Sequence, residues 1–305
     1  MNGLILLIVF IAGFAVFIAW SNRPIDQATA ISMINKRIAS TIGKKNVNQA
    51  IVIVDSPKTG VSKVFAHGEL NGAPIQDDQP FHVASVGKAF TATLIGMLID
   101  EGKITLNDQI SNYLPTELLN GLFVFDGVDH QSQVAVGQLL NHTSGAADYF
   151  EDEATGSPSI QGLVVSEPDT NWTPEDILAF SRNHQAAVGA PGDAYHYSDT
   201  GFILLGLLIE SISGKSFDAL LHEKIFNPLG MKDSYLMFYS EPANGLRPIA
   251  DIHLGAVNVK DYQSLSIDWA GGGIISTAHD LAIFIRALNN GEIISKSTLE
   301  SLYQF

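Results

Sequence analysis

The stretch Ser85–Glu101 opens with a serine and a lysine three residues apart, and it directly follows an apolar, strand-like run at Phe81–Ala84. Apolar residues recur through the stretch at helical spacing, and Gly102 is a suitable residue to end a helix. The sequence therefore predicts a strand that leads directly into a helix. Because positions i and i+3 share one face of a helix, Ser85 and Lys88 should be neighbours.

This pairing suits nucleophilic chemistry. A serine hydroxyl is a poor nucleophile at neutral pH and needs a base within hydrogen-bond reach. The free N–H groups of a first helical turn also favour developing negative charge. The apolar run before Ser85 should leave Lys88 poorly hydrated, and desolvation lowers a lysine pKa so that the amine can act as a base. The alternative is a serine N-cap followed by a surface lysine, because such pairs recur by chance.

A second polar segment contains Tyr197 and Asp199, between a Pro191–Gly192 turn and an apolar helical pattern. A tyrosine at such a junction is often only a packing residue. A phenol that hydrogen-bonds to Ser85 and Lys88 could instead relay a proton to a leaving group. Asp199 would then point toward the same cleft, and the alternative makes it the N-cap of the following helix.

With both motifs, the chain resembles the serine β-lactamase and penicillin-binding-protein superfamily, especially its class C β-lactamase, D-alanyl-D-alanine carboxypeptidase and esterase branch. The resemblance runs from about Ala28 to the C-terminus. It is carried by five collinear segments: Pro80–Pro115, Val136–Tyr149, Tyr195–Phe217, Phe226–Leu236 and Ala270–Ile285. It implies an α/β (α+β) β-lactamase-like fold, with an antiparallel sheet flanked by helices, a mostly helical subdomain, and an active site between them.

The resemblance also implies roles for single residues. Ser85 would be the acylated nucleophile, and Lys88 and Tyr197 would share the proton transfers. Asp199 would belong to the substrate-binding residues, at a position where the family usually has asparagine. A carboxylate cannot donate a hydrogen bond to a substrate carbonyl, and it can pair with Lys88 and hold it charged. This favours an esterase or a peptidase over a β-lactamase.

The family carries a third motif, Lys-Thr-Gly or His-x-Gly, on a strand after the Gly-rich segment that is here Gly272–Thr277. Nothing in Gly291–Phe305 resembles it. Lys58–Gly60 precedes the nucleophile and is predicted to be a hairpin turn, and His253–Gly255 precedes the Gly-rich segment and is predicted to be a loop. We therefore expect a truncated chain, in which the hydrolase domain (24–305) lacks its C-terminal portion and leaves a sheet edge unpaired.

Two functions are consistent with these residues. The first is a serine hydrolase that forms an acyl-enzyme on Ser85 and acts on an ester, a D-amino-acid peptide or a β-lactam. The alternative is a non-catalytic ligand-binding module that kept the fold and lost turnover with the third motif, since one missing oxyanion donor costs roughly 100- to 1000-fold in rate. The intact Ser85, Lys88 and Tyr197 favour the hydrolase.

The composition argues against some classes of binding partner. The formal net charge of −15 argues against nucleic acid, because phosphate binding needs clustered lysine and arginine. The chain has no cysteine, and its nine histidines show no ligand spacing such as His-Glu-x-x-His. We expect no metal and no cofactor, and a small-molecule or peptide-like acyl compound as the substrate.

The N-terminal segment, residues 1–22, is predicted to be a membrane anchor or a signal segment. Gly3–Trp20 is uncharged and apolar over a length that spans a bilayer core, which favours an uncleaved anchor. Arg23, Lys36 and Arg37 follow it, and by the positive-inside rule they would keep the body cytoplasmic. The family resemblance implies the extracytoplasmic side, which is the periplasmic side in a bacterium, and we expect that location.

Local patterns predict the remaining elements that matter for the site. Gln27–Ile42 is predicted to be a helix, and Ala50–Val54 and Val61–Ala66 are predicted to be strands. Gly156–Thr170 is polar and rich in turn-forming residues, which is typical of a flexible rim of a cleft.

Overall fold

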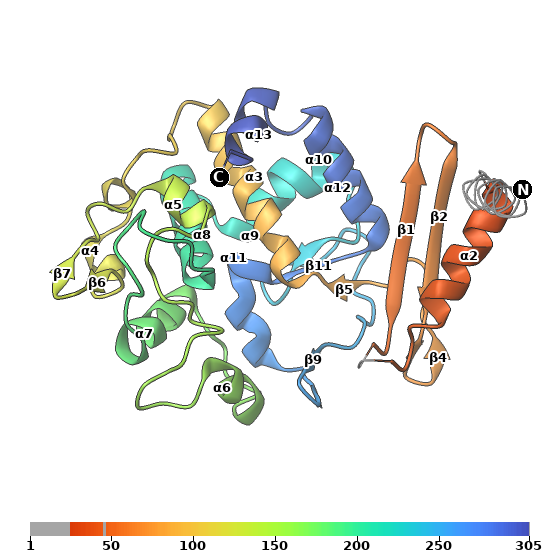
Figure 1. Ribbon diagram of the computed structural model, residues 1–305, viewed down its shortest axis with the longest axis horizontal. Helices are drawn as coiled ribbons and strands as arrows, with labels where there is room; N and C mark the ends of the chain where they lie inside the picture. Colours follow the sequence, from red (N-terminus) through yellow and green to blue (C-terminus); the bar gives the residue numbers. More distant parts are fainter. Residues whose placement is uncertain (1–24, 45–46, 305) are drawn as a thin grey trace, which may run out of the picture.

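The computed structural model describes residues 25–44 and 47–304. The predicted membrane segment, Gly3–Trp20, lies outside the described residues. Among the helices that are described, none combines the length and the apolar character needed to cross a membrane. Figure 1 shows a body of helices around short strands, with a long β-hairpin and one helix beside it.

The helices are α2 (Gln27–Ala39), α3 (Lys88–Asp100), α4 (Thr116–Leu119), α5 (Val136–Leu140), α6 (Ile160–Ser166), α7 (Pro174–His184), α8 (Asp199–Ser213), α9 (Phe217–Leu220), α10 (Asn227–Leu229), α11 (Trp269–Gly272), α12 (Ala278–Asn290) and α13 (Lys296–Leu302). The strands are β1 (Ala50–Ser56), β2 (Val61–His67), β3 (Glu69–Leu70), β4 (Ala73–Pro74), β5 (Phe81–His82), β6 (Val124–Phe125), β7 (Val128–Asp129), β8 (Tyr235–Leu236), β9 (His253–Leu254), β10 (Val257–Asn258) and β11 (Ile274–Ser276). Short helical turns of other types are η1 (Ala84–Gly87), η2 (Ile110–Asn112), η3 (Leu221–Phe226) and η4 (Gln263–Asp268).

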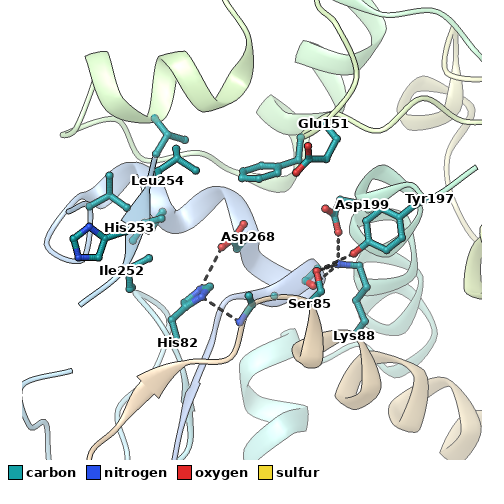
Figure 2. A pocket seen from close by; sticks show the side chains of 17 residues that line it. His82, Ser85, Lys88, Glu151, Tyr197, Asp199, Ile252, His253, Leu254 and Asp268 are labelled. Carbon is teal, nitrogen blue, oxygen red and sulfur yellow. Dashed lines mark hydrogen bonds and ion pairs between the residues drawn. The ribbon is translucent and has the colours of Figure 1, made fainter. Parts of the chain in front are cut away.

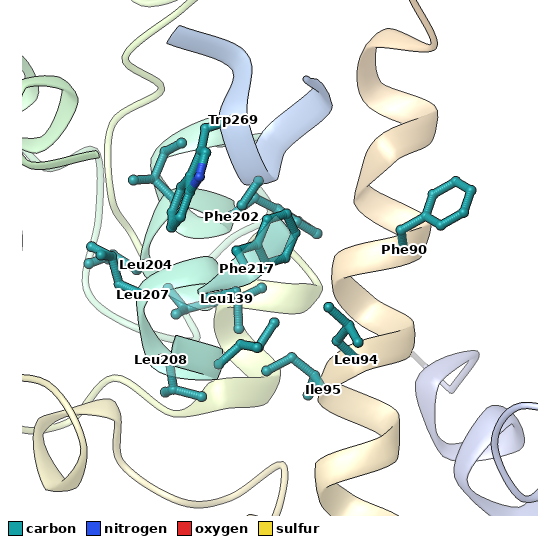
Figure 3. Packing of buried hydrophobic residues seen from close by; sticks show 14 of the residues in the cluster. Phe90, Leu94, Ile95, Leu139, Phe202, Leu204, Leu207, Leu208, Phe217 and Trp269 are labelled. Carbon is teal, nitrogen blue, oxygen red and sulfur yellow. The ribbon is translucent and has the colours of Figure 1, made fainter. Parts of the chain in front are cut away.

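Helices α3 and α8 form the centre of the body. Helix α8 is buried on every side over its first three turns, which is the pattern of a helix inside a core, and it ends at Gly214 in a left-handed cap. Figure 3 shows Leu94 and Ile95 of α3 facing the apolar side chains of α8. On another face of α3, Phe90 is fully buried and stacks on Phe284 of α12, with ring centroids 3.9 Å apart. Burial of such a side chain contributes about 1.5–3 kcal/mol, so α3 is held firmly in place.

A three-stranded antiparallel sheet leads into α3. Strand β11 lies in the middle and pairs with β5 on one side and β8 on the other. Ile275 is opposite both His82 and Tyr235, and all of β11 is buried. Because β5 is followed at once by η1 and α3, this sheet positions the start of the helix that carries Ser85 and Lys88.

Strands β1 and β2 form a separate hairpin that contacts α2 on one side and α12 on the other (Figure 1). Lys58–Gly60 lies in the turn between the two strands, so the predicted hairpin turn is confirmed. Within residues 25–44 and 47–304, β1 pairs only with β2. An apolar groove lies along β1, lined by Ile51 and Ile53 and by Leu281 and Ile285 of α12. Within the described residues, this groove therefore lies along the edge of β1 that faces away from β2.

A mostly helical part, with α4 to α7 and the β6–β7 hairpin, covers the opposite side of α8 (Figure 1). The mixed α/β class, with antiparallel strands and a helical part, is confirmed. Two details differ from the sequence predictions. The sheet is divided into the β1–β2 hairpin and the three-stranded sheet. The segment Gly156–Thr170 is only partly a loop, because Ser159 caps a short helix, α6, that buries Ile160 and Val164.

Candidate active site

Ser85 lies where the chain turns from β5 into α3. Val83 continues the strand pairing, since its N–H donates to the Ile274 carbonyl at 2.9 Å. Ala84 then adopts a left-handed backbone with φ of 47°. A non-glycine residue in such a conformation is strained by about 1–3 kcal/mol. The predicted strand therefore ends at His82, because the turn at Ala84 redirects the backbone.

This turn is packed directly against the Gly-rich segment. A Cβ atom added at Gly272 would lie 2.9 Å from the Ala84 carbonyl oxygen, and one added at Gly87 would lie 3.0 Å from Gly272 Cα. The close approach of two backbones requires residues without a side chain. Glycine at these positions therefore keeps η1 and α11 in contact beside Ser85.

Ser85, Lys88 and Tyr197 meet at this point (Figure 2). The Ser85 Oγ is 2.8 Å from the Tyr197 Oη and 3.1 Å from the Lys88 Nζ. Ser85 is exposed, whereas Lys88 is buried. The expected contact between Ser85 and Lys88 is confirmed, and the burial of Lys88 excludes the surface-lysine alternative.

The Lys88 ammonium has three acceptors, which match its three N–H groups. They are the Ser85 Oγ, the Gly271 carbonyl at 2.8 Å, and the Asp199 carboxylate, with which it forms an ion pair. Burial lowers the pKa of Lys88, but the charge and hydrogen bond of Asp199 outweigh it, and the pKa is raised above the ordinary value. Lys88 is desolvated as expected, but its pKa does not fall as desolvation alone would make it, because Asp199 pairs with it, as the sequence also suggested.

Asp199 is the first residue of α8, and Ser198 precedes it as the N-cap residue. The N-cap alternative for Asp199 is therefore wrong. Its own N–H donates to Asp148 Oδ1 at 3.1 Å, and the Phe150 N–H donates to the same oxygen at 3.1 Å. Burial, followed by the charge of Asp199, raises the pKa of Asp148 to about 6. Lys88, Asp199 and Asp148 thus follow one another in space, and of the two acids Asp199 is the one paired with a cation.

Tyr197 is held between one ring and a charge. The ring of His142 lies against it with centroids 4.4 Å apart, and Lys88 Nζ lies 5.1 Å from the centroid of the phenol ring. His142 Nδ1 accepts the Ser198 N–H at 3.1 Å, which fixes the backbone next to Tyr197. Burial, with the nearby Lys88 charge, lowers the pKa of His142. His142 therefore supports Tyr197 as a neutral ring.

A cavity of about 210 Å³ opens above Ser85. Apolar side chains from several segments line one side of it: Phe150, Val164, Ile252, Leu254, Val259 and Leu265. Carboxylates of Glu151, Asp199 and Asp268 line the same cavity. The segment His253–Gly255 was predicted to be a loop, but His253 and Leu254 form strand β9 at the rim of this cavity. The arrangement can hold an acyl group with an apolar part beside the Ser85 hydroxyl.

Two residues of the cavity were missed by the sequence interpretation. The nearly buried side chain of His82 faces the half-buried Asp268, with His82 Nε2 3.3 Å from Asp268 Oδ2 (Figure 2). The signal that could have found His82 is its place as the single polar residue in the apolar run before Ser85. Asp268 had no signal, because its partner is remote in the sequence.

Comparisons with known proteins agree with this arrangement. A family profile described as Beta-lactamase matches residues 43–305. The chain belongs to the Beta-lactamase family. Penicillin-binding protein 4 of Amycolatopsis lactamdurans is 30% identical over 244 residues, which are 73% of this chain and 57% of that protein. The resemblance to β-lactamases and penicillin-binding proteins is thus confirmed.

Solved structures of the Beta-lactamase fold also match. The D-stereospecific amidohydrolase from a Streptomyces species superposes with a TM-score of 0.72 and 27% identity, over 87% of this chain and 75% of that one. The D-amino acid amidase of Ochrobactrum anthropi SV3, complexed with L-phenylalanine amide, superposes with a TM-score of 0.71 and 26% identity, over 88% of this chain and 73% of that one. The chain spans about half the length of the curated relatives it matches.

Proposed function

We propose that this member of the Beta-lactamase family is a serine hydrolase that forms an acyl-enzyme on Ser85. The supporting observation is the meeting of an exposed Ser85 Oγ with Tyr197 Oη at 2.8 Å and Lys88 Nζ at 3.1 Å, at the floor of a cavity. A nucleophile, a proton carrier and a fixed charge within hydrogen-bond reach are the components of nucleophilic catalysis.

In the proposed mechanism, Tyr197 carries the proton. The Ser85 Oγ accepts a hydrogen bond from the Lys88 ammonium, so its own O–H is free to donate to the Tyr197 Oη. As Oγ attacks the substrate carbonyl carbon, the serine proton passes to Tyr197, and the tyrosine proton passes to the leaving group as its bond to carbon breaks. Water then attacks the acyl-serine, the relay runs in reverse, and the acid leaves with Ser85 restored.

Lys88 has an electrostatic role in this mechanism. Because Asp199 holds it charged, its ammonium stabilises the negative charge that develops on Ser85 Oγ and Tyr197 Oη during attack. The Asp199 carboxylate fixes the position of the ammonium. Because a carboxylate only accepts hydrogen bonds, it cannot donate one to a substrate. Asp199 therefore acts on the substrate through Lys88 and through the negative charge it adds to the cavity.

The charges of the cavity favour a neutral or cationic substrate. Glu151, Asp199 and Asp268 line it, and Lys88 is already paired with Asp199. A substrate with a free carboxylate, such as a penicillin, meets this negative charge at close range, where the repulsion is only weakly screened. We therefore propose an ester or a D-amino-acid amide or peptide over a β-lactam. The names of the structural relatives, an amidohydrolase and an amidase, support the amide class.

The proposal is tested by intact mass after exposure to a penicillin, to a p-nitrophenyl ester and to D-phenylalanine p-nitroanilide. We expect a stoichiometric acyl adduct or turnover with the ester or the anilide, lost in Ser85→Ala and kept in Ser297→Ala, which alters an exposed serine elsewhere. Labelling that persists in Ser85→Ala would contradict the mechanism. Saturable binding without any adduct would support the ligand-binding module instead.

We also propose that the protein works on the extracytoplasmic side, attached through residues 1–22. The proposal is supported by the apolar run Gly3–Trp20 and by the family resemblance. Fractionation of cells that express the full chain, followed by protease treatment from outside, tests it. Recovery of the protein in the cytosolic fraction would contradict it.

A further inference from the structure

The pair of His82 and Asp268 joins two segments of the site. His82 lies on β5, three residues before Ser85, and Asp268 is the last residue of η4, directly before α11. The His82 Nε2 is 3.3 Å from Asp268 Oδ2, and the His82 side chain is only 6% exposed. On its other side, the His82 Nδ1 lies 3.2 Å from the backbone nitrogen of Ala84 and accepts its N–H. Figure 2 shows both contacts from the same ring.

These contacts define the state of the imidazole. Because the Ala84 N–H donates to Nδ1, that nitrogen carries no proton, and the ring proton must be on Nε2, which faces the carboxylate of Asp268. Burial lowers the pKa of His82, against the opposing charge of Asp268, which is consistent with a neutral ring. A protonated ring would place an N–H against the Ala84 N–H and break the contact.

Both partners lie next to strained backbone. Ala84, with φ of 47°, immediately precedes Ser85, and Trp269, with φ of 24°, immediately follows Asp268. The α11 segment that Trp269 opens supplies the Gly271 carbonyl that accepts Lys88. Strained conformations persist only where surrounding contacts hold them in place. The pair connects the turn that presents Ser85 to the turn that presents the acceptor of Lys88.

We propose that His82, oriented by Asp268, is a positioning residue that holds the Ala84 turn and thereby sets the distance between Ser85 Oγ and Lys88 Nζ. This inference rests on the proposed serine hydrolase function. His82 does not touch the reacting atoms of Ser85, Lys88 and Tyr197, and it acts through the Ala84 N–H. The role differs from packing because it needs an acceptor at the Nδ1 position, which an apolar side chain of similar bulk lacks.

Two amide substitutions separate the two contacts of the ring. In His82→Asn, the side-chain oxygen can occupy the Nδ1 position and accept from Ala84, but the side chain is too short to reach Asp268. In His82→Gln, the amide can reach Asp268, but no acceptor remains at the Nδ1 position. His82→Leu keeps apolar bulk and removes both contacts. Each variant is checked for folding by circular dichroism and thermal unfolding before its reactivity is compared.

The first readout is the rate constant for labelling of Ser85 by a fluorophosphonate. We expect His82→Asn to remain within about 3-fold of the unchanged protein, and His82→Gln and His82→Leu to be slower by roughly 10-fold, because the Ala84 N–H loses its acceptor and the strained turn loses a hydrogen bond. Asp268→Asn should lie between these two groups, since it keeps a polar side chain of the same size beside Nε2 and removes only the charge. Rescue by asparagine but not by glutamine is the result that a merely space-filling histidine does not give.

The second readout does not depend on activity. Nitrogen-15 NMR of the histidine rings should show His82 as the neutral tautomer with the proton on Nε2 at neutral pH, and Asp268→Leu should weaken that preference. A proton on Nδ1, or equal labelling of the Gln and Asn variants, would overturn the positioning role while Ser85-dependent labelling still supported the hydrolase. Absence of labelling of the unchanged protein, as of Ser85→Ala, would instead overturn the proposed function, and the positioning role with it.

Discussion

The Asp199 carboxylate forms an ion pair with the Lys88 ammonium directly beneath the Ser85 hydroxyl. Both side chains are buried. A buried ion pair of this kind decides which group can accept a proton at neutral pH. In the proposed mechanism it makes Lys88 a fixed cation and leaves Tyr197 as the proton carrier.

Replacing Asp199 by asparagine should lower both the stability of the protein and the pKa of Lys88. The folded-state pKa of Lys88 is raised above 10.5, so the pair stabilises fully below that pH and is lost only as the pH rises through the folded-state pKa. At pH 7 the whole loss is therefore visible, up to about 3–5 kcal/mol for breaking a buried pair. Urea unfolding of Asp199→Asn at pH 7 measures it, beside Asp193→Asn, which changes an exposed acid nearby. Equal stability of the two variants would contradict the prediction.

Replacing Tyr197 by phenylalanine should slow acylation and leave the fold intact. The ring can still stack on His142, but the oxygen that lies 2.8 Å from Ser85 Oγ is lost. Loss of a positioned acid–base group costs about 100- to 10,000-fold in rate. The measurement is kcat with a p-nitrophenyl ester at fixed pH. Tyr195→Phe is the matched control, since Tyr195 is 68% exposed and also contacts His142, and its rate should be unchanged.

The local part of the site could be predicted from the sequence. Ser85 and Lys88 are close because helical geometry places i and i+3 on one face, and no tertiary information is needed for that. The convergence of Tyr197 on this pair rested on family resemblance, because no local pattern states which remote loop reaches a given helix. The sequence likewise left open whether desolvation or Asp199 governs the pKa of Lys88, since the answer depends on the distance to Asp199, which only the fold determines.

The helices and strands show the same difference between what local patterns predict and what only the fold determines. The β1–β2 hairpin and α2 have regular patterns and turn residues, so their positions were predicted closely. The short α6 inside Gly156–Thr170 was missed, because a two-turn helix gives little periodicity and its stability comes from the burial of Ile160 and Val164. Left-handed backbone at a non-glycine residue such as Ala84 has no signal in the sequence. For this reason the observed strand is shorter than the predicted one.

Asp148 should make the protein less stable as the pH rises from 4 to 7. Its folded-state pKa is raised from 3.8 to about 6, so its contribution is fully present below pH 3.8 and is lost as the pH rises through 6. The shift of roughly two units corresponds to about 3 kcal/mol. Chemical unfolding at pH 4, 5, 6 and 7 should show this decline, and Asp148→Asn should remove it. In Asp108→Asn the decline should remain, because the Thr105 hydroxyl lowers the pKa of the half-buried Asp108 and gives that residue the opposite slope.

The contact between Gly272 and Ala84 gives a test of the backbone beneath the nucleophile. In Gly272→Ala, the new Cβ would lie 2.9 Å from the Ala84 carbonyl oxygen, a distance that forces η1 and α11 apart. Overpacking of this kind costs about 1–3 kcal/mol of unfolding free energy, and it should move Ser85 away from Lys88. We therefore expect a lower midpoint of urea unfolding together with slower labelling of Ser85. Gly189→Ala is the control, because no atom lies within 4 Å of its added Cβ, and it should change stability by less than about 0.5 kcal/mol. If Gly272→Ala were as stable and as reactive as Gly189→Ala, the contact would not hold Ser85 in place.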